Sequence, residues 1–147
     1  GFAKAHEISA FSLLPLAEGA IPMMKKRGGG SIITMSFIGS VLAVPHYHVM
    51  GPAKASLESS SRYLAKEVGP ENIRVNVISP GPIKTLSASG IKDFAELMKI
   101  GGAHSAMKRT VTQEEVAQTA VFLASDASSG ITGQVIYVDC GYSIMAN

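Results

Sequence analysis

Cysteine and tryptophan are almost absent from this sequence. Its 147 residues contain one cysteine, Cys140, and no tryptophan. A single cysteine cannot form an internal disulfide, and a lone thiol is typical of proteins from reducing compartments. We therefore expect a cytoplasmic location, or the stroma of a plastid or a similar organelle if the source is eukaryotic.

Dense runs of one charge are also missing. The chain has 13 basic and 11 acidic residues, which gives a formal net charge of +2. The densest basic run is Lys25, Lys26 and Arg27. Nucleic-acid binding requires a continuous basic stripe, and because the charges here are scattered we expect no nucleic-acid partner.

No uninterrupted apolar stretch approaches the roughly 20 residues needed to cross a bilayer. Charged and polar residues interrupt even the apolar first 24 residues, namely Lys4, His6, Glu7 and Glu18. No basic segment precedes an apolar run there, so this region is interpreted as a soluble helix and not as a targeting segment. We expect no membrane partner.

A glycine-rich phosphate loop cannot be found. No G-x-G-x-x-G opens a helix, and "RGGGS" at residues 27–31 precedes a strand, which is typical of a helix-to-strand turn. The composition is that of an ordinary globular domain, with 46% hydrophobic and 16% charged residues. The chain starts at Gly1 without a methionine, and we expect it to be part of a longer polypeptide.

Hydrophobic periodicity predicts helices that alternate with short strands. Apolar residues three and four apart predict an amphipathic helix over residues 2–24, with a kink or break caused by Pro15 and Pro22. Strands are expected at 31–36, 73–79 and 134–139, and further helices at about 47–68, 91–99 and 112–124, with 100–110 irregular. Thr112 and Glu115 form the capping box of the last helix. Since the strands are continuously apolar, we expect an α/β fold with a doubly wound parallel sheet, covered by helices on both faces.

The segment "PHYHVMGPAKASLE", residues 45–58, contains a possible catalytic pair, Tyr47 and Lys54. In a doubly wound sheet the ligand lies beyond the carboxyl ends of the strands, and the pair follows the first loop at that end. Seven residues are almost two helical turns, so both side chains would share one face about 10 Å apart. An ammonium and a cationic nicotinamide would lower the pKa of the phenol, and the phenol could donate to an oxygen that gains negative charge. An isolated pair of this kind is more often a helix cap and a solvated cation.

The surroundings of the pair carry a family resemblance. Residues 31–94, "SIITMSFIGSVLAVPHYHVMGPAKASLE" and onward to "PGPIKTLSASGIKDF", and residues 108–139, "KRTVTQEEVAQTAVFLASDASSGITGQVIYVD", resemble the enoyl-acyl-carrier-protein reductases, a divergent branch of the short-chain dehydrogenase/reductase family. The Tyr-x6-Lys spacing is the most specific element, because ordinary members place the lysine four residues after the tyrosine. The resemblance implies that residues 1–147 are the C-terminal part of one Rossmann-like NAD(P)-binding domain, without its N-terminal Gly-rich strands.

The resemblance also implies an activity in fatty-acid biosynthesis. Hydride would pass from NADH, or NADPH, to the double bond of a trans-2-enoyl thioester on acyl-carrier protein, with catalytic residues Tyr47, which stabilises the enolate, and Lys54, which binds the nicotinamide ribose. The implied cofactor contacts are Lys54, Ser36, Ile83 and Thr85. The implied substrate contacts are Phe37, Tyr47, Met50, Ser87, Ala88, Ile91, Phe94 and Leu97. Family members are commonly homotetramers.

Two other functions stay open at this point. The chain could belong to an ordinary 3-oxoacyl or alcohol dehydrogenase, in which Tyr47 would protonate an alkoxide, or it could be a catalytically silent fragment with half a dinucleotide site. No metal site is expected, because His46 and His48 have no acid or thiol at ligand spacing. Cys140 is expected to be a small buried residue with an unreactive thiol.

Overall fold

A three-stranded parallel sheet forms the centre of the structure, a computed structural model that describes residues 1–83 and 94–146. Its strands are β1 (Gly30–Met35), β2 (Ile73–Pro80) and β3 (Val135–Val138), in the order β1-β2-β3. The predicted α/β class and the parallel sheet are confirmed, and each strand lies within one residue of its predicted bounds.

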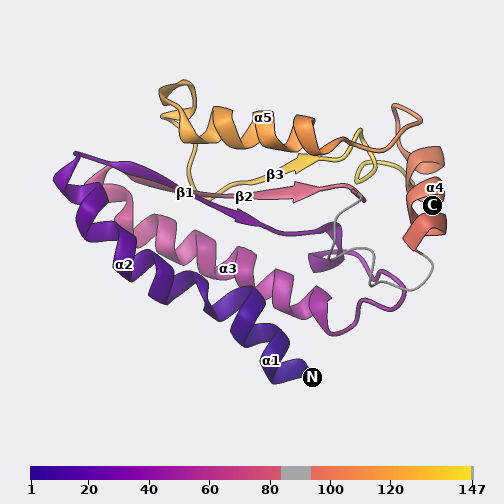
Figure 1. Cartoon of the computed structure of the whole chain (residues 1–147), viewed down its shortest axis with the longest axis horizontal. Coiled ribbons are helices and arrows are strands. Elements are labelled where there is room, and N and C mark those ends of the chain that lie inside the picture. The colour runs from indigo at the N-terminus through magenta and orange to yellow at the C-terminus, as the bar shows by residue number, and fades with distance from the viewer. Residues whose placement is uncertain (84–93, 147) are drawn as a thin grey trace.

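Helices cover both faces of this sheet, as Figure 1 shows. Helices α2 (Leu13–Lys26) and α3 (Met50–Val68) lie on one face, and α5 (Gln113–Ala124) lies on the other. One buried cluster packs β2 against α3, and the other packs it against α5. Each fully buried Val, Leu or Ile side chain stabilises the fold by roughly 1.5–3 kcal/mol. Strand β2 is the best buried of the three because both clusters meet on it.

The first helix is divided, as its prolines predict. A short helix, α1 (Phe2–His6), leads into a π-helical turn at Glu7–Phe11, where the Ser12 N–H donates to the Glu7 carbonyl at 3.1 Å. The ring of Pro15 would clash with the carbonyl of Phe11, four residues earlier, and the wide turn ends at that residue. Pro22 lies inside α2, which continues to Lys26, so no break occurs at this residue.

Helix α4 (Phe94–His104) is longer than predicted. Residues 100–104 were expected to be irregular because of Gly101 and Gly102, and that expectation is wrong. A Cβ on Gly101 would lie 3.1 Å from the Pro82 Cγ, so the helix passes unusually close to the chain that leaves β2. The glycine that lowers helix propensity therefore permits this contact.

The predicted capping box at the start of α5 is confirmed. The Thr112 hydroxyl accepts from the Glu115 N–H at 3.2 Å, and the Glu115 carboxylate accepts from the Thr112 N–H at 2.9 Å.

None of the described helices is both long and apolar enough to cross a membrane.

Candidate active site

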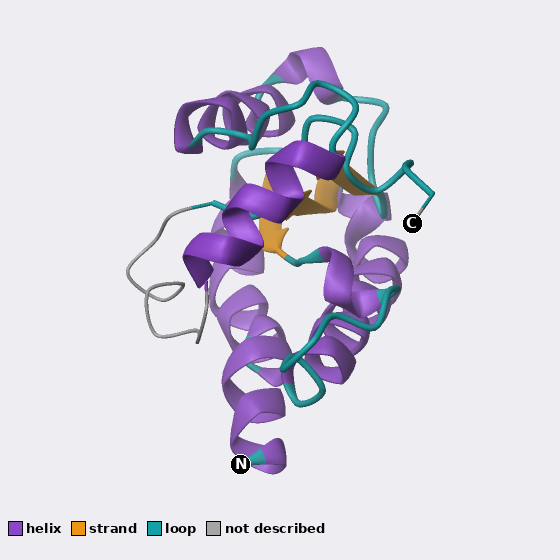
Figure 2. Cartoon of the chain, turned by 90° about the vertical axis from the view of Figure 1, so that its right-hand side faces the viewer, coloured by secondary structure: helices purple, strands orange, loops and turns teal. Residues whose placement is uncertain are grey.

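The carboxyl ends of the three strands lie at one end of the sheet, where Figure 2 shows loops gathered beside the C-terminus. The Gly81 N–H, just after β2, donates to the Val138 carbonyl at 3.0 Å. A Cβ on Gly81 would lie 3.1 Å from the Cα of Asp139, so the chains leaving β2 and β3 pack backbone to backbone. The Asp139 carboxylate accepts from the N–H groups of Gly141 and Ser143, each at 2.9 Å, which fixes the tail.

Tyr47 lies in the loop before α3 and not on the helix. Helix α3 begins at Met50, so the expectation that the pair shares one helical face is wrong. The reason is local, because His46 has a left-handed backbone with φ of 59°, which an α-helix of L-residues cannot contain. The Gly51 N–H donates to the Tyr47 carbonyl at 2.8 Å and joins the loop to the first turn of α3.

The ring of Tyr47 is enclosed by the preceding loop. It contacts the ring of Phe37 edge to face, with centroids 5.1 Å apart and an interplanar angle of 68°. Gly39 lies in the short 3-10 helix Ile38–Ser40, and a Cβ there would lie 2.5 Å from the Tyr47 Cδ1. The loop therefore holds the ring by close packing at a position that only glycine allows.

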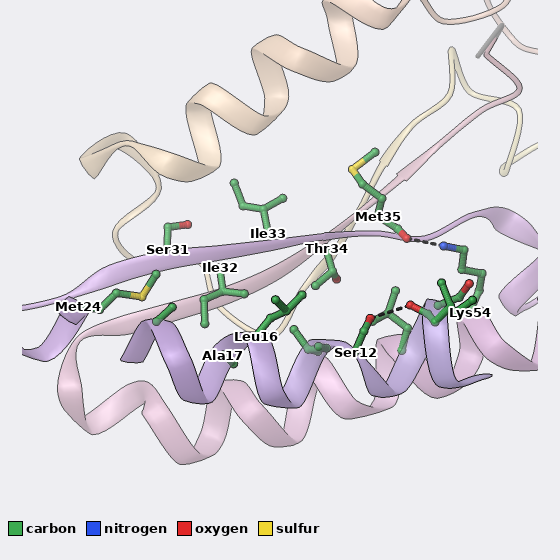
Figure 3. A pocket seen from close by; sticks show the side chains of 15 residues that line it. Ser12, Leu16, Ala17, Met24, Ser31, Ile32, Ile33, Thr34, Met35 and Lys54 are labelled. Atoms are coloured by element: carbon green, nitrogen blue, oxygen red, sulfur yellow. Dashed lines mark hydrogen bonds between the residues drawn. The ribbon is translucent and has the colours of Figure 1, made fainter. Parts of the chain in front are cut away.

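Lys54 reaches from the first turns of α3 to the end of β1. Its Nζ donates to the Met35 carbonyl at 2.8 Å, as the dashed line in Figure 3 marks. Burial lowers the pKa of this amine, and the negative charge of Glu58, one helical turn later, acts in the opposite direction. The ammonium is thus held at the carboxyl end of the sheet.

The pKa of Tyr47 moves against expectation in this chain. Its ordinary value is 10.0, and burial raises the pKa because a low-dielectric surrounding disfavours the phenolate. The predicted lowering by Lys54 is wrong for the described residues, where the ammonium donates to the Met35 carbonyl. The phenol therefore keeps its proton at neutral pH.

Ser36, an expected cofactor contact, faces α3. Its side chain donates to the Glu58 carboxylate at 2.5 Å, and the residue is only 4% exposed. Glu58 is itself 6% exposed, and sequence reasoning missed it. A signal was present, since Glu58 follows Lys54 by four residues and lies among the apolar positions of α3, where an acidic residue is rarely found without a partner.

A family model described as "Enoyl-(Acyl carrier protein) reductase" matches residues 1–143. The chain belongs to this family.

Relatives of the enoyl-acyl-carrier-protein reductase family match almost the whole chain. The proteins named enoyl-[acyl-carrier-protein] reductase [NADH] from Nostoc sp. and Bacillus subtilis are 57% and 52% identical over 145 and 146 residues. These matches cover 99% of this chain but 55% and 56% of the relatives. The chain therefore spans about half the length of the curated relatives it matches.

Solved structures of the family agree in fold. The Bacillus cereus enoyl-acyl carrier protein reductase with NADP+ and indole naphthyridinone has a TM-score of 0.95 at 49% identity, over all of this chain and 56% of that one. The Anaplasma phagocytophilum enzyme in complex with NAD has a TM-score of 0.93 at 42% identity, over 99% of this chain and 55% of that one. The Rossmann-like fold expected from the sequence is confirmed.

The structure describes only some of the other predicted site residues. The Ser9 hydroxyl donates a weak hydrogen bond to the Met50 sulfur at 3.9 Å, and Ile83 lines a cavity of about 570 Å³ beside Met98 and Val111. Thr85, Ser87, Ala88 and Ile91 lie outside the described residues. Phe94 and Leu97 lie on α4, and their side chains are outside what the structure describes.

Cys140 differs slightly from expectation. It is only partly buried and has a left-handed backbone with φ of 56°. Burial raises the pKa of its thiol, while the Arg109 guanidinium acts in the opposite direction with a smaller effect. The thiol form therefore dominates at neutral pH, which agrees with the predicted low reactivity.

The outer edge of β1 is open in the part of the chain that the structure describes. A groove of about 540 Å³ runs along it between β1 and α2, and Figure 3 shows Lys54 at one end. Its other lining residues are mostly apolar, among them Leu13, Leu16, Met24, Ile32, Ile33 and Met35. A strand edge with apolar walls is a surface that proteins normally cover.

Proposed function

We propose that these residues are the C-terminal, nicotinamide-binding part of an NADH-dependent enoyl-acyl-carrier-protein reductase of fatty-acid biosynthesis. The observation that carries the proposal is the placement of Lys54 Nζ on the Met35 carbonyl, at the carboxyl end of β1, with Tyr47 in the adjoining loop. The curated relatives that bear this activity in their names are 49–57% identical to the chain.

The donors of Lys54 suit a dinucleotide. A protonated lysine has three N–H donors and Met35 accepts one, which leaves two for the paired hydroxyls of a nicotinamide ribose. Bound NADH, or NADPH, would supply the hydride. Ser36, Ile83 and Thr85 are proposed as further cofactor contacts, Ser36 through its backbone because its hydroxyl is bound to Glu58.

Tyr47 is proposed to act on the substrate oxygen. Because burial raises its pKa, the hydroxyl is protonated at neutral pH and donates a hydrogen bond. A donor aimed at the thioester oxygen stabilises the enolate that forms when hydride reaches the β-carbon, and protonation of the α-carbon completes the reduction. The same hydroxyl would make a weaker bond to the uncharged carbonyl, so its effect falls mainly on the rate.

The acyl group is proposed to lie against apolar residues near Tyr47. Phe37 already contacts the Tyr47 ring, and Met50 lies in the first turn of α3. The other proposed contacts are Ser87, Ala88, Ile91, Phe94 and Leu97. Acyl-carrier protein would deliver this thioester, and an apolar pocket over a nicotinamide would exclude water from the reaction.

The rest of the domain is proposed to cover the open edge of β1. The relatives are nearly twice as long as this chain, and a parallel strand from that other part would satisfy the unpaired backbone groups of β1. Leu16 on α2 and Tyr63 on α3 are 72% and 74% exposed. These exposed apolar groups support the proposal of a homotetramer, and the composition supports a cytoplasmic or plastid-stromal location.

The decisive test uses the full-length polypeptide with two thioesters. We expect NADH-dependent reduction of crotonyl thioester and no reduction of acetoacetyl thioester. Equal rates on the two would instead support an ordinary 3-oxoacyl reductase.

Tyr47→Phe is expected to lower kcat by about 10²-fold with little change in KM, as for the loss of one donor to a developing oxyanion. Lys54→Met is expected to weaken NADH binding about tenfold or more.

The isolated 147 residues provide a second test. Since the Gly-rich phosphate loop is missing from this sequence, we expect NADH fluorescence to show weak binding or none. Tight binding by these residues alone would contradict the proposed division of the site.

A further inference from the structure

Glu58 is a buried carboxylate that the proposed reaction does not use. It is 6% exposed and lies four residues after Lys54 on α3, close to one helical turn. A carboxylate removed from water is costly unless other groups bind it. Its position on the face of α3 that covers the sheet therefore needs an explanation.

Two consecutive residues at the end of β1 are held by two residues one turn apart on α3. Ser36 donates to the Glu58 carboxylate at 2.5 Å, and Lys54 donates to the Met35 carbonyl at 2.8 Å. The Ser36 N–H also donates to the Ile78 carbonyl at 2.8 Å, which fixes this residue to β2. The strand end, the carboxylate and the ammonium form one connected unit.

Hydroxyl groups continue from this unit across the sheet. Ser79 on β2 lies beside Ser36 and pairs with Tyr137 on β3, so the three side chains share the face toward α3. Ser79 is 1% exposed, and its hydroxyl has no hydrogen-bond partner among the described residues. The charge of Glu58 adds to the burial that raises the pKa of Tyr137. Glu58 thus binds Ser36, just after β1, and its charge also acts on Tyr137 on β3.

We propose that Glu58 is a positioning residue that holds the ammonium of Lys54 at the carboxyl end of β1, through its hydrogen bond with Ser36 and through its negative charge. The inference rests on the proposed role of Lys54 in binding the nicotinamide ribose. It adds a residue to the site that makes no contact with cofactor or substrate.

The charge of Glu58 has a consequence for the titration of Lys54. Burial lowers the pKa of this amine, and Glu58 opposes that effect. Among the described residues, Tyr137 on β3 also responds to the charges of Glu58 and Asp139, and burial raises the pKa of Tyr137 and of Tyr47, in the loop before α3, above the ordinary 10.0. Without Glu58, Lys54 would lose its proton at a lower pH.

Two variants of the full-length polypeptide separate the charge of Glu58 from its hydrogen bond with Ser36, and a third variant is the control. Glu58→Gln keeps the shape and an acceptor for Ser36 but removes the charge, whereas Ser36→Ala keeps the charge and removes the hydrogen bond. Glu67→Gln is the matched control, because Glu67 is an exposed carboxylate on the same helix. Circular dichroism would confirm that each variant is folded.

The first measurement is the titration of Lys54 in cofactor-free protein, by NMR of carbon-13-labelled lysine with the signal assigned through Lys54→Met. We expect the midpoint to shift to lower pH in Glu58→Gln and to stay at the wild-type value in Glu67→Gln. An unchanged midpoint in Glu58→Gln would overturn the proposal. Because no cofactor is present, this result does not depend on whether the protein reduces enoyl thioesters.

The second measurement is NADH affinity against pH. In Glu58→Gln we expect binding within about twofold of wild type near pH 7 and clearly weaker than wild type at a pH between the two measured Lys54 midpoints, a split that general loosening of the fold would not produce. In Ser36→Ala we expect about threefold weaker binding at both pH values. If Glu58→Gln fails to fold, wild-type affinity and an unchanged Lys54 titration in Ser36→Ala would overturn the proposal. Wild-type protein that binds no NADH would contradict the proposed function instead.

Discussion

Replacement of Gly39 by alanine tests whether the loop before α3 positions Tyr47. The added Cβ would lie 2.5 Å from Cδ1 and 2.9 Å from Cε1 of the tyrosine ring. Carbon atoms that are not bonded to each other approach to about 3.5 Å, so the ring or the short 3-10 helix must move by roughly 1 Å. The ring has little freedom to move, because Phe37 packs on it edge to face.

The displacement sets the size of the expected effect. A misplacement of about 1 Å at a reacting group can lower a rate by about 10²-fold. Inserting a methyl group into a packed site typically costs about 1–3 kcal/mol of folding free energy. We therefore expect Gly39→Ala to lower kcat for crotonyl thioester by at least tenfold and to destabilise the fold by about 1–3 kcal/mol.

Steady-state kinetics and urea denaturation of the full-length polypeptide would measure the two effects. Gly19→Ala is the matched control, because Gly19 is exposed in α2 and, apart from its chain neighbours and the backbone of its own helix, nothing lies within 4 Å of the Cβ position. The control should keep wild-type kcat and gain about 0.5–1 kcal/mol of stability from helix propensity. A wild-type kcat in folded Gly39→Ala would refute the idea that the loop fixes the tyrosine ring.

Three smaller predictions concern the elements around the site. Thr112→Ala removes the side-chain cap of α5 and should destabilise the fold by about 1 kcal/mol in urea denaturation. Hydrogen bonds from Arg109 and Thr112 lower the pKa of Glu115 from 4.5 to about 2, so its stabilising effect is fully present above pH 4.5 and is lost as the pH falls through about 2. The difference in urea midpoint between wild type and Glu115→Gln should therefore vanish at the acid end, and a difference that persists there would contradict this assignment. Gly81→Ala adds a methyl group 3.1 Å from the Asp139 Cα, and faster amide exchange is expected in the tail after β3.

The elements that the sequence predicts well are those governed by local pattern. Strand β2 is a continuous apolar run between two turns, and it appears within one residue of its predicted bounds. The capping box of α5 needs only Thr112 and Glu115 three residues apart. Such features follow from residues close in the chain, so no knowledge of packing is required.

The elements predicted poorly depend on contacts between distant segments. Residues 100–104 are helical, and Gly101 in this stretch passes close to Pro82, which lies nineteen positions earlier in the sequence. The loop position of Tyr47 follows from the left-handed backbone of His46, a conformation that histidine only occasionally adopts. Neither outcome can be derived from hydrophobic periodicity.

In the candidate site, too, the sequence pattern predicts some features, and others depend on tertiary packing. The Tyr-x6-Lys spacing indicates the two residues and the family, but the bond from Lys54 to the Met35 carbonyl depends on how α3 packs on β1. The burial of Glu58 depends on the same packing, since Ser36 meets it from the strand. The residues that position a functional group are harder to predict than the group itself.

The open edge of β1 and the lysine of the proposed site belong to one surface. Lys54 lines the groove beside that edge and donates to Met35, the last residue of β1. A strand that paired with β1 would bury the apolar wall of the groove and reduce the access of water to the ammonium, which would lower the pKa of Lys54 further. The need for the charge of Glu58 would then increase on completion of the sheet. We therefore expect the effect of Glu58→Gln on the titration of Lys54 to be larger in the full-length polypeptide than in these 147 residues, wherever both are folded.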